Sequence, residues 1–443
     1  MQIFTKNNID KKKINYLLIF IYIFFILQLI FKLKWYEPFD SADWDSHWKY
    51  LRAVTFSLIY KDSDWPGWMY APWYYFLCAY TFGVIFYLFK FLNILNFNQE
   101  GIAAMYTFLF SNCVFQMIMA TGTLRLARKL FTKNISIFFF LGLACFLPYA
   151  HKSTYHYVSE NLAQCLFPWM LYYLIKYFKK NNINNLLKFS IIFSLFATNK
   201  MNCFVIAFPV LFFLLTCRTL NEKKFDYKIL ILPILISSLL LFLSFILHKG
   251  IWIWDSPVLR DPNLFPGYAD KPSLQIFYTV NLFDALKNPL NQNYSMLNRW
   301  AIDFFGDYSH QSFILKKRID EKDISYINSL SVIATFFFIF WYLICLTKIL
   351  YYFSFNLVKN FQIQFSVLFF LIIPLYIGYS FVVFNKDLTN SFDLRYSGFL
   401  IFFLIYPLVY QFEINKNLLI KKISAYLSSI FILTSWGFLN FYL

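Results

Sequence analysis

Apolar runs of nearly membrane-spanning length recur along this 443-residue chain and constrain its fold more than any other feature. A helix that crosses the hydrocarbon core of a bilayer needs about 20 mostly apolar residues. Only 14% of the residues are charged, whereas soluble proteins carry about 25%. The pattern excludes an ordinary cytosolic enzyme and predicts an all-α, polytopic membrane protein with eleven spans. The predicted spans are 14–36, 102–124, 135–150, 161–178, 185–199, 201–217, 228–247, 327–350, 363–384, 397–412 and 423–442.

One more apolar stretch, 71–97, determines the orientation of every span that follows it. If the N-terminus is cytoplasmic and 71–97 does not cross, 21 basic and 4 acidic residues fall on the cytoplasmic side. The outer side then holds 19 residues of each sign, so the whole surplus of +17 lies inside. Membrane proteins tend to keep their basic residues on that side. We therefore predict that 71–97 lies in the plane of the membrane or re-enters it.

This orientation divides the chain into three parts. Residues 1–247 form a transmembrane module that includes a first outer loop, 37–101, with juxtamembrane helices. Residues 248–326 form a second outer loop, and residues 327–443 form the C-terminal transmembrane helices. No small-residue cleavage pattern follows the first apolar run, so we expect it to remain as an anchor. The expected location is the cell (inner) membrane, with a cytoplasmic N-terminus.

The densest cluster of titratable groups follows the first predicted span. Asp40, Asp43, Asp45 and His47 lie within eight residues, among tryptophans. Like charges and burial raise the pKa of a carboxyl group, which prepares one of these groups to act as a general base. The same residues also fit a solvated acidic loop, or a divalent-metal site made of two Asp and one His.

Three further positions on the predicted outer face place polar groups at the membrane boundary. Glu160 begins a span shortly after His151, where it fits a reactive acid or a carboxylate that stabilises a helix N-terminus. Lys200 lies between two apolar runs, where a lysine either extends to the surface or holds an anion. Arg395 and Tyr396 precede a late span, where they fit a phosphate-binding fork or an interfacial anchor.

In their order and spacing, these motifs resemble the GT-C superfamily of membrane glycosyltransferases. The most similar group is the bacterial relatives of the protein O-mannosyltransferases and of the lipid A aminoarabinose transferase, which are glycosyltransferase family 39-like. Asp43-Trp-Asp45-Ser-His47 resembles that family's Asp-Glu or Asp-x-x-x-His signature in the first outer loop. Tyr70-Ala-Pro72-Trp-Tyr74-Tyr75 resembles its His-Pro-Pro-Leu-Tyr-Tyr stretch on a juxtamembrane helix, with Tyr70 in place of the His.

Three later matches extend the resemblance over about the first 200 residues and then the 385–400 region. They are Val158-Ser-Glu160, Asn199-Lys200 and Arg395-Tyr396. The resemblance implies transfer of a sugar from a polyprenyl-phosphate donor to a hydroxyl of a lipid, glycan or protein acceptor on the outer face. The expected catalytic residues are Asp43, Asp45 and Glu160. The expected substrate-binding residues are His47, His151, Lys200, Arg395 and Tyr396.

Trp44 replaces the second acid of the Asp-Glu form, so either Asp43 or Asp45 can be the base. We expect no cofactor and no nucleic acid partner; a divalent metal is compatible but not required, because the donor leaves as a lipid monophosphate. The main alternative is a transporter or flippase of an amphipathic or anionic envelope substrate. Such proteins usually carry ionisable residues in mid-span and internal repeats, whereas these spans are nearly free of charge and no repeat is visible. A third class is a non-enzymatic subunit of an envelope-assembly complex.

Overall fold

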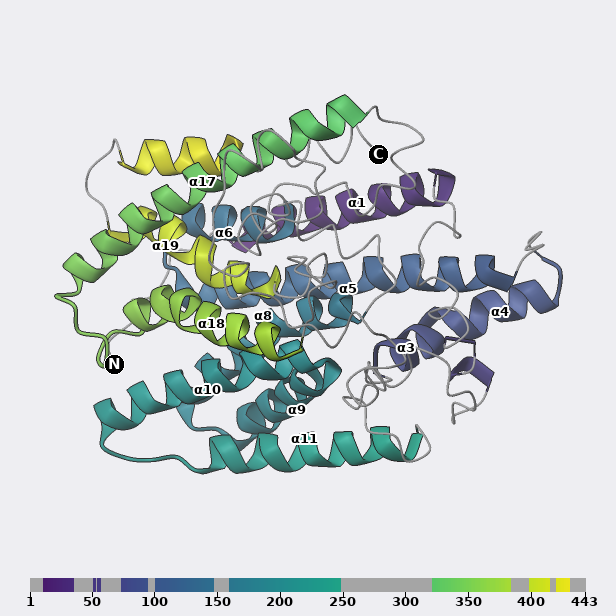
Figure 1. Ribbon diagram of the computed structural model, residues 1–443, viewed down its shortest axis with the longest axis horizontal. Coiled ribbons are helices and arrows are strands. Elements are labelled where there is room, and N and C mark those ends of the chain that lie inside the picture. The colour runs from purple at the N-terminus through teal and green to yellow at the C-terminus, as the bar shows by residue number, and fades with distance from the viewer. Residues whose placement is uncertain are drawn as a thin grey trace.

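The computed structural model describes a helical bundle (Figure 1). The described residues are 11–35, 51–52, 54–56, 73–94, 100–146, 159–247, 321–383, 398–414 and 420–430. No strand occurs among these residues, and almost all of them are helical. The predicted all-α class is therefore confirmed.

Each predicted span overlaps a helix in the described part of the chain. The long helices are α1 (Lys11–Trp35), α5 (Glu100–Leu130), α6 (Asn134–Phe146), α8 (Glu160–Lys180), α9 (Ile183–Asn199), α10 (Met201–Glu222), α11 (Lys228–Leu247), α17 (Glu321–Tyr352), α18 (Phe361–Val383) and α19 (Ile401–Ile414). A short 3₁₀ turn, Gly398–Leu400, precedes α19, and residues 420–430 are helical within the last predicted span.

Six helical segments in the described part are long and apolar enough to cross a membrane. They are Lys12–Ile30, Trp73–Phe91, Ile102–Leu130, Asn202–Glu222, Lys228–Leu247 and Ile333–Tyr352. Three shorter apolar helices are Asn134–Phe146, Phe361–Tyr376 and Gly398–Ile414. The chain is therefore a helical protein with several segments suited to a bilayer, and the count of eleven crossings stays a prediction.

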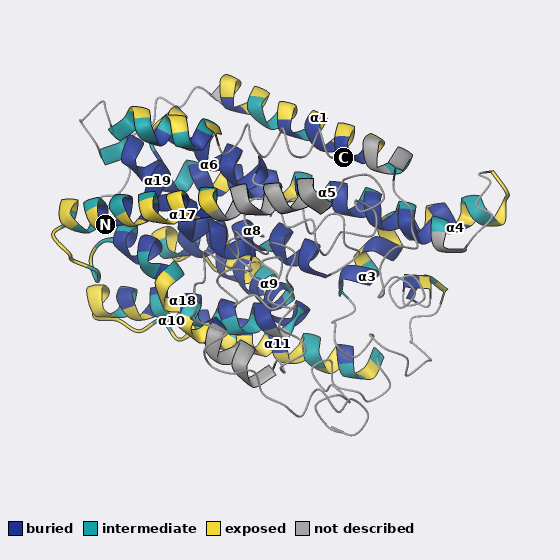
Figure 2. Ribbon diagram, turned by 45° about the horizontal axis from the view of Figure 1, so that its top comes forward, coloured by how far each residue is buried: buried dark blue, intermediate teal, exposed yellow. Residues whose placement is uncertain are grey.

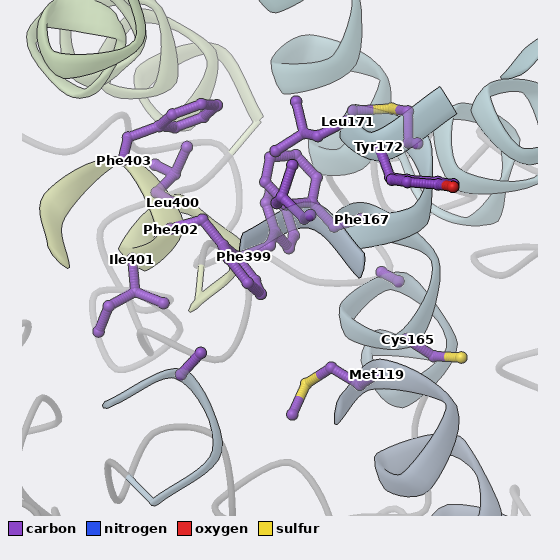
Figure 3. Packing of buried hydrophobic residues seen from close by; sticks show 14 of the residues in the cluster. Met119, Cys165, Phe167, Leu171, Tyr172, Phe399, Leu400, Ile401, Phe402 and Phe403 are labelled. Atoms are coloured by element: carbon purple, nitrogen blue, oxygen red, sulfur yellow. The ribbon is translucent and has the colours of Figure 1, made fainter. Parts of the chain in front are cut away.

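The central helix of the bundle is α8, and its position explains why it is less apolar than its neighbours. It packs against α5 and α9, and 14 of its 21 residues are buried. Phe167 contacts Phe399 and Phe402, with ring centroids 5.2 and 5.7 Å apart (Figure 3), and it contacts Phe196 at 5.3 Å. Other helices shield α8 from lipid, so it can carry polar residues that a lipid-facing helix cannot.

The helix α11 shows the opposite pattern. Ile231, Leu235, Leu239 and Phe242 are all exposed, and Figure 2 shows a line of exposed residues along this helix. An exposed apolar face of this length is typical of a surface that contacts lipid or another protein. It agrees with the prediction that α11 lies in a membrane.

A continuous helical segment precedes α5 and packs along the first part of it. The segment consists of α3 (Trp73–Cys78), a π-helical turn η1 (Ala79–Gly83) and α4 (Val84–Phe91). Tyr74 packs on Phe108 of α5 at the start of the segment, and Phe86 packs on Phe110 near its end. Figures 1 and 2 show α4 and the start of α5 projecting together beyond the rest of the bundle.

The opposite side of the α3–η1–α4 segment is exposed and largely apolar. Leu77, Tyr80, Val84 and Leu88 are 40% to 55% exposed and follow one another at helical spacing. This pattern suits a helix that lies on a membrane surface. The segment is also long and apolar enough to cross a membrane, so its in-plane placement stays a prediction.

The helix ends that the charge pattern assigns to the cytoplasm lie at one end of the bundle. Arg128 at the end of α5 donates to Asn15 of α1 at 3.0 Å. Arg218 of α10 donates to Asn181, after the end of α8, at 2.8 Å. Lys133, just before α6, donates to the main chain at the end of α19. These basic residues therefore share one end, and its assignment to the cytoplasm stays a prediction.

Candidate functional site

Two of the eight candidate site residues lie in the described part of the chain, and they contact each other. The Lys200 ammonium donates to a carboxylate oxygen of Glu160 and forms an ion pair with it. The Glu160 side chain is 1% exposed and the Lys200 side chain is 14% exposed. Both residues were expected to be functional, but their pairing was not predicted. The six candidates outside the described residues are Asp43, Asp45, His47, His151, Arg395 and Tyr396.

The backbone around Lys200 explains how its side chain reaches this position. Lys200 is a single extended residue (φ −158°, ψ 153°) between the end of α9 and the start of α10. Its carbonyl oxygen accepts from the backbone N–H groups of Cys203 at 3.0 Å and Phe204 at 3.2 Å. Lys200 therefore begins α10 without belonging to either helix, and it lies at the tip of a helical hairpin.

Glu160 is the first residue of α8, and its neighbours join that helix to the tip of the hairpin. The carbonyl oxygen of Ser159 accepts from the backbone N–H groups of the first turn of α8. The same oxygen accepts from the side-chain Nδ2 of Asn199, the last residue of α9, at 2.8 Å. The two ends are therefore held together, and a carboxylate in the first turn of α8 is stabilised by the helix dipole.

Buried amide side chains lie on the helices that begin or end at the pair, or on α5, and sequence reasoning did not identify them. Their exposed fractions are 5% or less, and they come from four helices: Asn112 on α5, Asn161 and Gln164 on α8, Asn199 on α9 and Asn202 on α10. Three of them are direct sequence neighbours of Glu160 or lie within two residues of Lys200. Their position beside charged residues at the ends of apolar runs is the sequence signal that could have identified these amides. We call Glu160, Lys200 and these five amides the polar cluster.

The start of α3 lies against the polar cluster. The indole N–H of Trp73 donates to the Thr198 hydroxyl at 3.2 Å. The fully buried Tyr74 hydroxyl donates to Asn112 Oδ1 at 2.9 Å and lies within hydrogen-bonding range of Asn161. Two residues of the stretch that resembles the family's juxtamembrane helix therefore hold α3 against α5, α8 and α9. The first part of that stretch, residues 70–72, lies outside the described residues.

The cluster joins a carboxylate to a cation in a buried setting that also contains amide side chains. Each charge would be costly to bury alone, and together they offset part of that cost. The N-termini of α8 and α10 both lie beside the pair and add positive potential. Both features favour the ionised carboxylate, and the ammonium could stabilise an anion that takes the place of Glu160 beside it. The part of the chain that the structure describes holds no group of three or more His, Cys, Asp or Glu placed to bind a metal.

The fold and the polar cluster define a helical, membrane-type protein with a buried ion pair where three helices end. No protein-family model matches the chain, and a search of curated proteins finds no significant match. A function is therefore inferred from the residues and their packing.

Proposed function

We propose that this chain is a membrane glycosyltransferase that uses a polyprenyl-phosphate-linked sugar. It moves the sugar to a hydroxyl of a lipid, glycan or protein acceptor at the outer face of the cell membrane. The observation that supports the proposal is the buried contact between Glu160 and Lys200. Glycosyl transfer needs a base for the acceptor hydroxyl and a cation for the departing phosphate, because charge develops on both during the reaction.

The proposed topology has eleven crossings, a cytoplasmic N-terminus and α3–α4 on the outer surface of the membrane. The basic end of the bundle then faces the cytoplasm, in agreement with the charge rule. The polar cluster lies at the opposite ends of α8 and α9, near the level of lipid head groups. The phosphate of a polyprenyl carrier occupies this level, while its chain remains in the bilayer.

In the proposed reaction, an incoming lipid phosphate competes with Glu160 for the Lys200 ammonium. The bond from the sugar to the acceptor oxygen forms while the bond from the sugar to the phosphate oxygen breaks. The acceptor proton passes to a carboxylate, and the polyprenyl phosphate leaves with the electron pair of the broken bond. Asp43, Asp45 and Glu160 are the proposed proton acceptors, and Arg395 is a second proposed contact of the phosphate. The reaction requires no cofactor.

The purified protein in proteoliposomes, supplied with a panel of labelled polyprenyl-phosphate sugars and an acceptor lipid, tests this proposal. We expect Lys200→Met to lower the transfer rate about 10²-fold, as removal of one preorganised anion contact does in other enzymes. The control is Lys188→Met, because Lys188 lies on the same helical hairpin but near the opposite end, over Tyr173. Equal rates in the two variants would contradict the proposed role of Lys200.

One observation favours a second candidate, a transporter or flippase of an amphipathic or anionic substrate. Glu160 is almost completely buried, and buried ionisable residues of membrane proteins often mark substrate or proton pathways. Sealed proteoliposomes distinguish the two functions. Movement of the labelled lipid across the bilayer without release of polyprenyl phosphate supports the transporter, whereas release of polyprenyl phosphate with a glycosylated product supports the transferase.

A further inference from the structure

We infer that Ser159 and Asn199 bind hydroxyl groups of a sugar, next to the Glu160–Lys200 pair. This inference rests on the proposed function and adds a contact for the sugar to the contact proposed for the phosphate. The observation is a pair of buried polar atoms. Ser159 and Asn199 are both 0% exposed, and neither Ser159 Oγ nor Asn199 Oδ1 has a hydrogen-bond partner within the described residues.

Buried polar side-chain atoms in folded proteins nearly always have a partner, so two neighbouring exceptions need an explanation. The two residues touch, because Asn199 Nδ2 donates to the Ser159 main-chain oxygen at 2.8 Å. That bond uses a donor of the amide, and the amide oxygen Oδ1 is left without a partner within the described residues. Glu160 and Lys200 follow these residues directly in the sequence, so a group bound here lies beside the ion pair.

The hydrogen-bonding capacity of the two atoms indicates which class of ligand fits them. Asn199 Oδ1 only accepts hydrogen bonds, whereas the Ser159 hydroxyl can donate or accept. A sugar hydroxyl can donate to the first and complement the second, whereas an unprotonated anion cannot donate to Oδ1. A divalent cation also favours oxygen ligands, especially carboxylates, but Ser159 Oγ and Asn199 Oδ1 are uncharged and the adjacent Glu160 carboxylate is already paired with Lys200. A neutral polyhydroxylated group therefore fits best.

Such hydroxyls can come from the sugar of the donor or from a sugar on the acceptor. Three kinds of probe separate these sources in binding measurements on the full-length protein in nanodiscs. The first is bare decaprenyl phosphate, and the second is decaprenyl phosphate that carries mannose, glucose or galactose. The third is octyl mannoside, a glycolipid without phosphate.

Ser159→Ala is the informative variant, because it removes only the hydroxyl. The main-chain oxygen that accepts from Asn199 remains, and the Ser159 side chain makes no capping bond to α8. Ser190→Ala is the matched control. Ser190 is also fully buried on α9, and its hydroxyl also lacks a partner in the described part. It lies nine residues before Asn199, about 13 Å along the helix.

We expect Ser159→Ala to weaken the binding of at least one sugar-bearing probe about three- to ten-fold, the effect of losing one hydrogen bond. Its affinity for bare decaprenyl phosphate should stay the same, and Ser190→Ala should change neither affinity. Weaker binding of the decaprenyl phosphates that carry a sugar identifies the donor sugar as the ligand. Weaker binding of octyl mannoside alone identifies an acceptor sugar.

Three results would overturn the inference. One is unchanged affinity of Ser159→Ala for every sugar-bearing probe, and another is an equal loss for bare and sugar-bearing lipids. The third is Ca²⁺ or Mg²⁺ binding that Ser159→Ala abolishes, because it would make these atoms a cation site. If wild type binds bare decaprenyl phosphate, these results leave the proposed function intact. If wild type binds none of the probes, the proposed function fails together with this inference.

Discussion

Glu413 of α19 caps the N-terminus of α6, and Lys133, just before α6, caps the C-terminus of α19. Both contacts lie at the end of the bundle away from the polar cluster. The Glu413 carboxylate accepts from the backbone N–H groups of Thr132 at 3.2 Å and Lys133 at 2.9 Å, just before α6 begins. It also accepts from the Ser136 hydroxyl at 2.6 Å. In return, Lys133 Nζ donates to the carbonyl oxygens of Phe412 and Glu413, at the end of α19. A negative group at a helix N-terminus and a positive group at a C-terminus both stabilise helices.

We therefore expect Glu413→Ala to lower the free energy of unfolding by about 2 kcal/mol, the upper value for loss of a helix cap. The measurement is the thermal unfolding midpoint of the purified protein in detergent. Glu222→Ala is the matched control, because Glu222 forms a partly exposed pair with Arg218 on α10, and such surface pairs contribute about 0 to 1 kcal/mol. Equal midpoints for the two variants would show that the double cap is not important for stability.

Close packing of α5 on α8 makes Gly122 sensitive to any added side chain. A Cβ at Gly122 would lie 2.6 Å from Cδ1 and Nε1 of Trp169, well inside van der Waals contact. The indole cannot move away freely, because its N–H donates to the Ile118 carbonyl at 2.9 Å. We expect Gly122→Ala to cost about 1–3 kcal/mol of stability, as overpacking does elsewhere. The double variant Gly122→Ala/Trp169→Phe should regain part of the loss in the same thermal measurement, and no loss in the single variant refutes the contact.

The Glu160–Lys200 pair should show strong thermodynamic coupling. Removing one member of a buried ion pair leaves an uncompensated charge and typically costs about 3–5 kcal/mol. We expect Glu160→Gln and Lys200→Met each to destabilise the protein, and the double variant to be more stable than the sum of the two losses predicts. A complete double-mutant cycle of unfolding measurements checks this. Additive losses would show that the two charges do not interact.

That double variant also separates stability from function. It removes both charges together, so it should unfold at a temperature close to that of the wild type while it loses the proposed transfer activity. A stable double variant with full transfer activity would exclude the pair from catalysis, whatever its effect on folding.

The helical class and the approximate positions of the described helices were predictable, because run length and mean polarity are properties of the sequence itself. The polar cluster was only half predictable. Glu160 and Lys200 could each be identified as a charged residue at the edge of an apolar run. Their contact could not be predicted, because they are 40 residues apart and no local pattern encodes how α8 packs on the α9–α10 hairpin. The amides were missed for a different reason. Asn161, Asn199 and Asn202 carry no charge, and only burial by neighbouring helices makes an amide noteworthy.

The predicted in-plane position of α3–α4 can be tested by labelling one exposed residue at its end. Phe91 is 82% exposed, and all seven native cysteines are buried, so a Phe91→Cys variant should present the main reactive thiol. We expect a membrane-impermeant maleimide to label it from the outside of intact cells. Phe225→Cys is the control, because Phe225 is 54% exposed between α10 and α11 on the predicted cytoplasmic side. Labelling of Phe91→Cys only after permeabilisation would mean that α3–α4 crosses the membrane, and the proposed topology would be inverted beyond it.

The sharpest chemical prediction concerns the acidic loop after the first span, outside the described residues. If one of Asp43 and Asp45 accepts the acceptor's proton, its isosteric amide cannot do so, while the similar size of Asn allows the protein to fold and insert. We favour Asp43, because it precedes His47 by four residues, as the acid does in the Asp-x-x-x-His form of the resembling family. In a helix this spacing places both side chains on one face. Loss of general-base catalysis costs about 10²–10⁴ in rate, so Asp43→Asn should lose that much sugar transfer and Asp45→Asn distinctly less. The initial rate at saturating donor is the measurement. A reversed order moves the role to Asp45, and near-normal transfer by the double Asn variant leaves Glu160 as the one remaining proposed base.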